Sequence, residues 1–336
     1  MNLYDKKTGY LDWPDILKHS GPLLFMTGAR GIGKSFGCVK YFLDSRIPFL
    51  YMRRLQTEAD LQQQPETSDL EKIFQARGIS ARYEKIAHGK ICRVIDTADE
   101  REICEVIALS TFAGIRSVNF DRFDWLIYDE FIPEPHIKKI KMEGFALQQA
   151  LESIGRNREL EGRPPLRLVA LSNSLNLAND IFIQFDLVET AEKLFRDEQS
   201  EIAHLGDRTL ILPRNSPISR RKASTMLYRN ASEEFSRMAI RNEFVLNDMS
   251  YVHKRPIREF VIRFRVGDLY VYRHKTNGSY YVTFTKSPTK NAYETNKNDL
   301  ERLRREKRRF WWGYLDGKIR FESYRAVALF EEYFGG

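Results

Sequence analysis

Between Leu23 and Glu189, short apolar runs alternate with longer amphipathic stretches. The runs that predict strands are LLFMT (23–27), PFLYM (48–52), WLIY (125–128) and RLVALS (167–172), with weaker ones at 91–95 and 105–110. Their apolar positions are continuous, which is typical of parallel strands covered by helices on both faces. The alternation predicts a three-layer α/β domain with a mostly parallel sheet over residues 1–195.

The pattern changes beyond about residue 190. Residues 219–245 have helical spacing and many charges, and they predict a helical linker module over residues 196–249. Residues 260–284 alternate apolar and polar positions around an Asn-Gly turn, which favours an antiparallel meander. A helix capped by Asn298 with Glu301 is expected next, and another helix at the end of the chain. Residues 250–336 are therefore predicted to form a small α+β domain.

The composition excludes several classes of protein. The chain has 336 residues, enough for one large or two ordinary domains, and only three cysteines, too few for a disulfide scaffold. It has no apolar run long enough to span a membrane and no signal-peptide pattern, so we expect a soluble, intracellular protein with no membrane partner. The net charge is +8, and residues 250–336 hold 19 Lys and Arg against 10 Asp and Glu. This basic segment fits contact with a polyanion, although a solubilising surface explains the charge equally well.

Residues 28–35, GARGIGKS, match the phosphate-binding pattern G-x-x-x-x-G-K-[ST]. The glycines allow backbone amides to turn toward a phosphate, the lysine reaches the β- and γ-phosphates of ATP, and the hydroxyl binds Mg²⁺. An apolar run precedes the loop and a helical pattern (34–44) follows it, so the triphosphate would lie at a helix N-terminus. The candidate nucleotide-binding residues of this loop are Gly28, Arg30, Gly31, Gly33, Lys34 and Ser35.

Two further strand ends carry polar residues. Asp129 and Glu130 directly follow the apolar run WLIY, where Asp129 is expected beside Mg²⁺ and Glu130 is expected to polarise the attacking water. Asn173 follows the run RLVALS, where its amide is a candidate for sensing the γ-phosphate or orienting water, although Asn between serines is also ordinary turn chemistry.

Several basic residues are candidates for contact with phosphates. Arg156 closes the helical stretch 145–159, where it is either an arginine finger for a neighbouring subunit's ATP or a cation that favours the helix dipole. Arg116 lies in the loop before the Asp-Glu strand, and Arg53 and Arg54 either serve a site or end a strand in solvent. A dense group in the last domain either contacts DNA phosphates or solvates a helix. Its members are Arg302, Arg304, Arg305, Lys307, Arg308 and Arg309.

GARGIGKS, YMRR, LIYDEFI, RNRE and LSNS, in this order and at these separations, resemble the genome-packaging ATPases of small tailed phages with protein-primed DNA. Those proteins belong to the additional-strand, catalytic-Glu ring motors, together with terminase large subunits. The resemblance implies a P-loop ATPase that packages double-stranded DNA through a capsid portal as a homomeric ring, most simply a pentamer. It implies that Arg156 acts in trans and that Arg116 can act across the same interface.

The resemblance also implies that residues 250–336 form a vestigial ribonuclease-H-type nuclease fold without cleavage activity. A structural RNA on the portal, as in some relatives, is left open. The protein is expected in the host cytoplasm, transiently at the procapsid and not in the mature virion. The alternatives are a DNA helicase, an ATP-dependent nuclease, or a nucleic-acid-binding protein that uses ATP only as a switch.

Overall fold

The computed structural model describes residues 1–133, 140–173, 179–197, 199–222, 224–230 and 252–334. The chain divides into two compact units. Unit 1 comprises Met1–Asn176 and Gln184–Leu246, and unit 2 comprises Leu177–Ile183 and Asn247–Gly336. In the described parts of the chain, no helix is long and apolar enough to cross a membrane.

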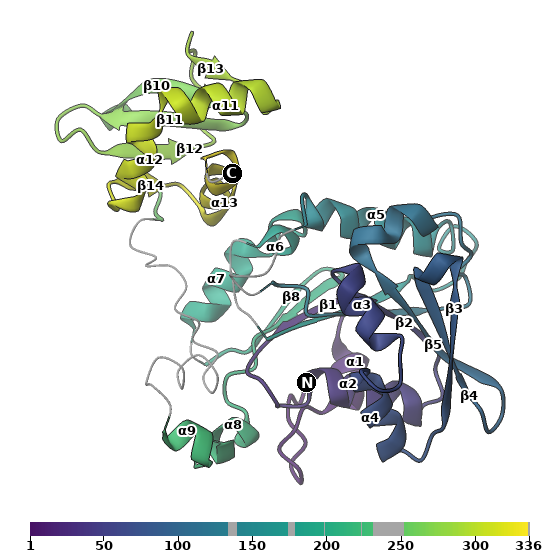
Figure 1. Ribbon diagram of the computed structural model, residues 1–336. Coiled ribbons are helices and arrows are strands. Elements are labelled where there is room, and N and C mark those ends of the chain that lie inside the picture. The colour runs from purple at the N-terminus through teal and green to yellow at the C-terminus, as the bar shows by residue number, and fades with distance from the viewer. Residues whose placement is uncertain (134–139, 174–178, 198, 223, 231–251, 335–336) are drawn as a thin grey trace. The chain divides into compact units, whose positions relative to one another are not determined.

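Unit 1 is built on one nine-stranded sheet with the strand order β3-β4-β5-β2-β6-β7-β1-β9-β8 (Figure 1). The pairs from β5 to β9 along this order are parallel, whereas β3, β4 and β8 pair antiparallel at the two edges. The strands are β1 (Leu23–Thr27), β2 (Phe49–Arg53), β3 (Ala81–Ile86), β4 (Ile91–Asp96), β5 (Arg101–Ala108), β6 (Trp125–Asp129), β7 (Arg167–Ser172), β8 (Ile202–Leu205) and β9 (Arg208–Ile211).

Helices cover both faces of this sheet. Figure 1 shows α1, α2 and α4 on one face and α5 on the other. The helices of unit 1 are α1 (Trp13–His19), α2 (Lys34–Asp44), α3 (Gln56–Gln62), α4 (Asp69–Ala76), α5 (Glu143–Gly155), α7 (Val188–Arg196), α8 (Pro217–Lys222) and α9 (Met226–Arg229), with short 3₁₀ turns η1 (Ala87–Gly89) and η2 (Leu109–Ile115). Helix α6 (Asp180–Gln184) falls almost entirely in the Leu177–Ile183 stretch of unit 2. The predicted three-layer α/β architecture is confirmed.

The sheet extends further along the chain than the sequence pattern predicts. Strands β8 and β9 belong to the nine-stranded sheet, although they lie inside the predicted helical linker 196–249. β9 pairs in parallel with β1, so the sheet extends past the predicted boundary at residue 195. Within the predicted helix 219–245 the structure describes only α8 and α9, and residues 231–245 lie outside the described part.

Unit 2 is a small α+β unit, with a five-stranded sheet in the order β13-β10-β11-β12-β14. The antiparallel pairs β10–β11 and β11–β12 form the predicted meander, and β13 and β14 pair in parallel at the two edges. Its elements are η4 (Ile257–Glu259), β10 (Phe260–Val266), β11 (Leu269–His274), β12 (Tyr280–Thr283), β13 (Ala292–Tyr293), α11 (Lys297–Glu306), α12 (Arg308–Leu315), β14 (Ile319–Phe321) and α13 (Tyr324–Phe334).

Candidate nucleotide site

The predicted site residues of unit 1 follow the carboxyl ends of adjacent parallel strands. β7 lies between β1, which leads into the 28–35 loop, and β6, which ends at Asp129. Thr27 pairs with Ser172, and Leu171 pairs with Asp129. Ligands of open α/β sheets bind outside such carboxyl ends. The carboxyl end of the central strands, called the nucleotide edge below, is therefore the expected location of a nucleotide site.

The loop between β1 and α2 has the backbone of a phosphate cradle. Gly33 caps α2 with a φ of 92° and Gly31 has a φ of 73°, which residues with a side chain rarely adopt. The loop therefore leads directly into the N-terminus of the 11-residue helix α2.

Lys34 is buried in this cradle, with 5% of its surface exposed. Its Nζ donates hydrogen bonds to the carbonyls of Gly28 (2.7 Å) and Ala29 (2.6 Å). Burial lowers the pKa of Lys34 to about 7, and no carboxylate of the described chain lies within ion-pair distance of Nζ. A buried ammonium bound only by carbonyls fits an anionic partner, because a phosphate would compensate its desolvation.

Ser35 and Asp129 are hydrogen-bonded to each other at the nucleotide edge. The Ser35 Oγ donates to Asp129 Oδ1 at 2.8 Å, and Tyr51 Oη donates to Asp129 Oδ2 at 2.7 Å. Asp129 is 5% exposed, so its carboxylate is held on both oxygens at a defined place beside the loop. This hydroxyl and carboxylate form a donor set that suits Mg²⁺, which keeps several waters and takes its remaining ligands from substrate phosphates.

Glu130 lies next to this pair and is more accessible, with 48% of its side chain exposed. Its carboxylate accepts a hydrogen bond from Arg53 Nη2, while Arg53 Nη1 lies 3.6 Å from Asp129 Oδ2. Burial alone would lower the pKa of Arg53, but Tyr51 and the two carboxylates hold it well above its usual range. Arg53 is therefore a permanent cation shared by Asp129 and Glu130.

Asn173 follows β7 and is partly exposed. Because β7 lies between the P-loop strand and the Asp129 strand, Asn173 is placed at the same edge as both. The amide of Gly28 donates to the carbonyl of Ser172 at 3.2 Å, which joins the start of the loop to the residue before Asn173.

Directly after β2, a buried ion pair of Arg54 with Glu143 connects the sheet to α5. Arg54 donates to both oxygens of Glu143, at 2.7 and 2.8 Å, and Tyr128 Oη donates to Glu143 Oε1 at 2.7 Å. The side chains of Arg54 and Glu143 are 1% and 5% exposed. Consecutive arginines at the end of β2 thus serve two purposes, since Arg53 contacts Glu130 and Arg54 anchors the first turn of α5.

The two candidate trans-acting arginines lie on one surface of unit 1. Arg156 caps α5 with a φ of 45°, is exposed, and donates through Nη2 to the carbonyl of Val118 at 3.3 Å. Arg116 is also exposed and donates to Gln149 of α5 at 2.5 Å. Arg158, by contrast, is 4% exposed and is bound to Asp124 and to the carbonyl of Phe123. Arg158 is therefore a structural residue, and Arg116 and Arg156 are the accessible cations.

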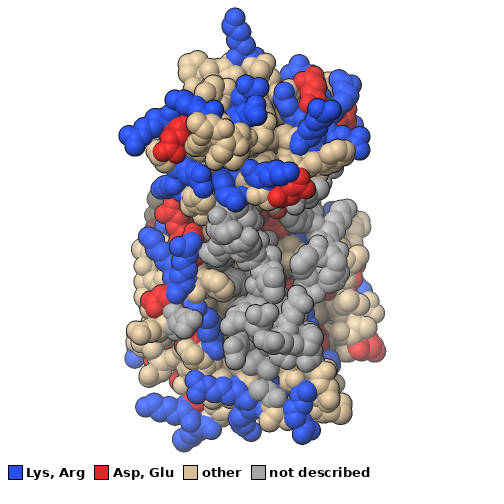
Figure 2. Space-filling model, turned by 90° about the vertical axis from the view of Figure 1, so that its left-hand side faces the viewer, with Lys and Arg blue, Asp and Glu red and all other residues tan. Residues whose placement is uncertain are grey.

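The six basic residues predicted to contact DNA do not form one free surface. Arg304 donates to the carbonyls of Tyr333 and Glu332, and Lys307 lies over the rings of Phe264 and Tyr293. Arg302 lies over Tyr293 and pairs with Asp299, and Arg308 lies over Trp312. Arg305 and Arg309 are exposed and form no ion pair within the described chain. On the face that Figure 2 shows, Lys and Arg side chains are spread out and are not gathered into one patch.

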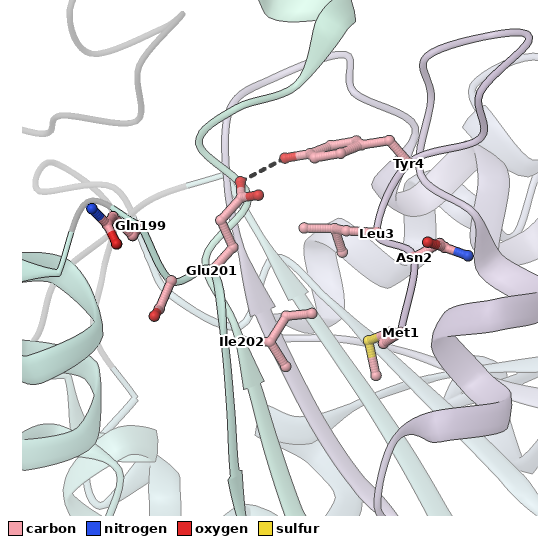
Figure 3. Close-up of a pocket in the computed structure, with 8 residues that line it drawn as sticks. Met1, Asn2, Leu3, Tyr4, Gln199, Glu201 and Ile202 are labelled. Carbon is pink, nitrogen blue, oxygen red and sulfur yellow. Dashed lines mark hydrogen bonds between the residues drawn. The ribbon is translucent and has the colours of Figure 1, made fainter.

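A surface pocket lies away from the P-loop, between the N-terminal segment and the start of β8 (Figure 3). Tyr4 Oη donates to Glu201 Oε1 at 2.7 Å across it. Its lining contains no Lys or Arg side chain, so it does not have the chemistry of a triphosphate site. Within the described residues, no group of three or more His, Cys, Asp or Glu side chains is placed to hold a metal ion.

A mostly parallel sheet with a P-loop after β1, Asp129 and Glu130 at the end of β6, and strand β7 between β1 and β6 defines an additional-strand P-loop NTPase. A family model for the podovirus DNA encapsidation protein (Gp16) matches residues 5–322, so the chain belongs to that family. The resemblance inferred from the motifs is confirmed.

Individual relatives agree with this family. The DNA packaging protein of Bacillus phage phi29 is 26% identical over 299 residues, which cover 85% of this chain and 82% of the relative. That of Bacillus phage B103 is 25% identical and covers 92% of this chain and 95% of the relative. The bacteriophage Phi-29 viral genome packaging motor assembly matches the fold with a TM-score of 0.66 at 21% identity, over 97% of this chain and 100% of that one. The Phi-28 gp11 DNA packaging motor matches with a TM-score of 0.62 at 19% identity, over 95% of each chain.

The sequence pattern leaves the roles of Arg53 and Arg54 open and does not mark Tyr51 or Glu143 as site residues. Arg53 follows Tyr51 in a strand that is adjacent to the Asp129 strand. The signal that could have found Arg53 is its place at the end of an apolar run, the same rule that identified Asp129. No local signal marks Glu143, whose partner Arg54 is 89 residues away in the sequence.

Proposed function

We propose that this chain is the ATPase of a viral motor that moves double-stranded DNA into a preformed capsid. The observation that carries the proposal is the meeting of the P-loop Ser35 with Asp129 beside Glu130, in a chain that also contains a basic second unit. Membership in the encapsidation family and the packaging names of its relatives favour genome packaging over other ATP-dependent processes.

The residues at the nucleotide edge would have separate roles in ATP hydrolysis. Lys34 would bind the β- and γ-phosphates, and Ser35 and Asp129 would hold Mg²⁺, an ion that neutralises charge on the phosphates. Glu130 would polarise the attacking water once its carboxylate leaves Arg53, because a carboxylate paired with a cation is a weaker base. Asn173 would orient that water or sense the γ-phosphate.

Assembly would complete the site. Arg156, and Arg116 on the same surface, would stabilise negative charge on the phosphates bound by a neighbouring subunit in a ring, most simply a pentamer. We further propose that the ring docks on the capsid portal in the host cytoplasm, with or without a structural RNA, and that unit 2 is a vestigial ribonuclease-H-type domain that binds DNA without cutting it.

A DNA-stimulated ATPase assay with the purified chain tests the proposal. Double-stranded DNA should raise ATP turnover, and portal-bearing empty capsids should protect DNA from nuclease digestion in an ATP-dependent reaction. Strand separation would indicate a helicase, and Mg²⁺-dependent cutting would indicate a nuclease. Tight ATP binding with no DNA-stimulated turnover would indicate a nucleotide-switched binding protein.

A further inference from the structure

The chain that follows β9 packs against the P-loop. A Cβ on Gly28 would lie 3.0 Å from Pro213 Cδ, and a Cβ on Gly31 would lie 2.3 Å from Lys222 Nζ. Pro213 thus contacts the loop at its first residue, Gly28, and Lys222 contacts it at Gly31, in its middle. In the sequence, this segment is the first part of the connection from the nine-stranded sheet to unit 2.

Lys222, at the end of α8, adds a cation to the loop. Its Nζ donates to the carbonyl of Arg30 at 2.7 Å, and its side chain is partly buried. Burial and the nearby Arg30 guanidinium both lower the pKa of Lys222, and the charge of Lys222 contributes in turn to the lowered pKa of Lys34. No carboxylate of the described chain forms an ion pair with Lys222. Three cations near one loop repel one another, and an anion bound there would relieve that repulsion.

The position of Lys222 is fixed by packing. Ser216, Ile218 and Ser219 of the same segment are buried, and Pro217 lies against Gly9, where a Cβ would be 3.0 Å from the proline Cβ. After the helix, the amide and hydroxyl of Thr225 both donate to the carbonyl of Lys222, at 2.9 and 2.8 Å. The ammonium is therefore held beside the loop by an ordered segment.

We propose that Lys222 binds the terminal phosphate of ATP and so connects the nucleotide state of the P-loop to the segment that leads toward unit 2. The proposal rests on the proposed function, because it requires that ATP binds at the P-loop. An ammonium that contacts the γ-phosphate distinguishes ATP from ADP, whereas Lys34 and the loop amides bind both nucleotides. Segment 213–222 then has a different partner before and after hydrolysis.

Equilibrium binding of Mg²⁺ complexes of a non-hydrolysable ATP analogue, adenylyl imidodiphosphate, and of ADP tests the inference in the full-length chain. Lys222→Met should weaken binding of the analogue about tenfold, the usual size of a lost charged hydrogen bond, and should change ADP binding less than twofold. Lys222→Arg should restore most of the lost affinity. Arg221→Met is the matched control, because it removes a charge from the adjacent, exposed position.

Hydrogen exchange provides a second measurement. The analogue should slow amide exchange in α8 and in the P-loop of the wild-type chain, but only in the P-loop of Lys222→Met. Equal loss of analogue and ADP affinity, tighter binding by Lys222→Met, or an unchanged affinity would each overturn the inference. Failure of the nucleotide site itself has a different result, because the wild type and Lys34→Ala would then bind both nucleotides equally poorly.

Discussion

At the scale of single residues, Glu130 combines an unusual backbone with an unusual partner. Its φ is 59°, a left-handed conformation that costs energy for a residue with a side chain, and its carboxylate is bound to Arg53. Such conformations persist where the surrounding structure fixes them, and the Glu130 amide donates to Asp129 Oδ1 at 3.1 Å. The structure therefore fixes the backbone of Glu130 and leaves its half-exposed side chain able to exchange partners.

Loss of the lysine and loss of the glutamate should have different effects. Lys34→Ala removes a phosphate counter-charge and should abolish both tight ATP binding and hydrolysis. Glu130→Gln keeps the size of the side chain and the contacts of Asp129, so it should retain bound Mg²⁺–ATP while turnover falls by at least about 100-fold. Nucleotide binding and phosphate release, measured on the same preparations, check this difference. Near-normal turnover by Glu130→Gln would remove that residue from the catalytic role.

Arg53 should restrain Glu130 when no DNA is bound. Arg53→Gln removes an ion pair worth about 1 kcal/mol at a partly exposed carboxylate, so ATP turnover without DNA should rise severalfold and stimulation by DNA should shrink. Arg46→Gln, which removes an exposed arginine paired with Asp99, is the control and should leave both rates unchanged. A fall in turnover together with weaker nucleotide binding would instead assign Arg53 to holding Asp129.

At the scale of elements, the buried pair of Arg54 and Glu143 connects β2 with the first turn of α5. Tyr128 of β6 adds a third hydrogen bond, so two strands and one helix meet at a single carboxylate. The other end of α5 carries Arg156. Helix α5 thus extends from the buried Arg54–Glu143 ion pair at its N-terminus to Arg156, at the proposed subunit interface, at its C-terminus.

Breaking this pair should destabilise unit 1 strongly. Glu143→Ala leaves a buried arginine without its carboxylate and should lower the free energy of unfolding by about 3–5 kcal/mol. Replacing both partners, as Arg54→Met with Glu143→Leu, should recover much of that loss because no buried charge remains. Urea unfolding followed by circular dichroism measures both, with Glu84→Ala at an exposed pair as the control, expected to cost less than about 1 kcal/mol. Equal losses of unfolding free energy for Glu143→Ala and Glu84→Ala would contradict a stabilising role of the Arg54–Glu143 pair.

The basic helices of unit 2 offer a test with an internal control. Arg305 and Arg309 are the exposed members that have neither an ion pair nor a ring contact in the described chain, whereas Arg308 lies over Trp312 and Arg304 caps α13. Replacing both Arg305 and Arg309 by Gln should weaken binding to duplex DNA and reduce the slope of log affinity against log salt by about two, one for each lost phosphate contact. Arg304→Gln should lower stability and leave that slope nearly unchanged. An unchanged slope in the double variant would support a solvated surface.

The sequence predicts elements where burial leaves a strong pattern and fails where it does not. Continuous apolar runs identify β1, β2, β6 and β7, because these strands are buried on both faces. The edge strands β3 and β8 contain only partly or fully exposed residues, so their sequences carry little signal. The N-cap of α11 is Asn296, whose side chain accepts from the Asp299 amide, and not the predicted Asn298, because two asparagines of equal propensity lie within one turn. Contacts such as Arg54 with Glu143 depend on tertiary packing and are not encoded locally.

At the scale of the whole molecule, the chain joins a nucleotide edge, an arginine-bearing surface and a basic unit. Arg116 and Arg156 are exposed and contact main-chain or amide oxygens, not carboxylates, within the described chain. Guanidinium groups without a carboxylate partner are suited to a phosphate supplied by another subunit. A ring is the simplest assembly in which each such surface meets a neighbouring P-loop, because a heterologous interface can close on itself.

Mixed rings test whether Arg156 acts on a neighbouring subunit. Arg156→Ala and Lys34→Ala should each lose ATP turnover when assembled alone, because a finger supplied in trans is worth about 10³–10⁵ in rate. When the two variants are mixed, an Arg156→Ala subunit that supplies the P-loop beside a Lys34→Ala subunit that supplies the finger rebuilds one complete site. ATPase activity should therefore recover in part, and its dependence on the mixing ratio should peak near equal amounts. Mixing Lys34→Ala with Glu130→Gln is the control, since both changes affect the P-loop side and no interface is restored. If subunit exchange is verified and the first mixture stays inactive while Arg156→Ala alone keeps its turnover, Arg156 only caps α5, and the same mixing experiment with Arg116→Ala identifies the trans-acting residue.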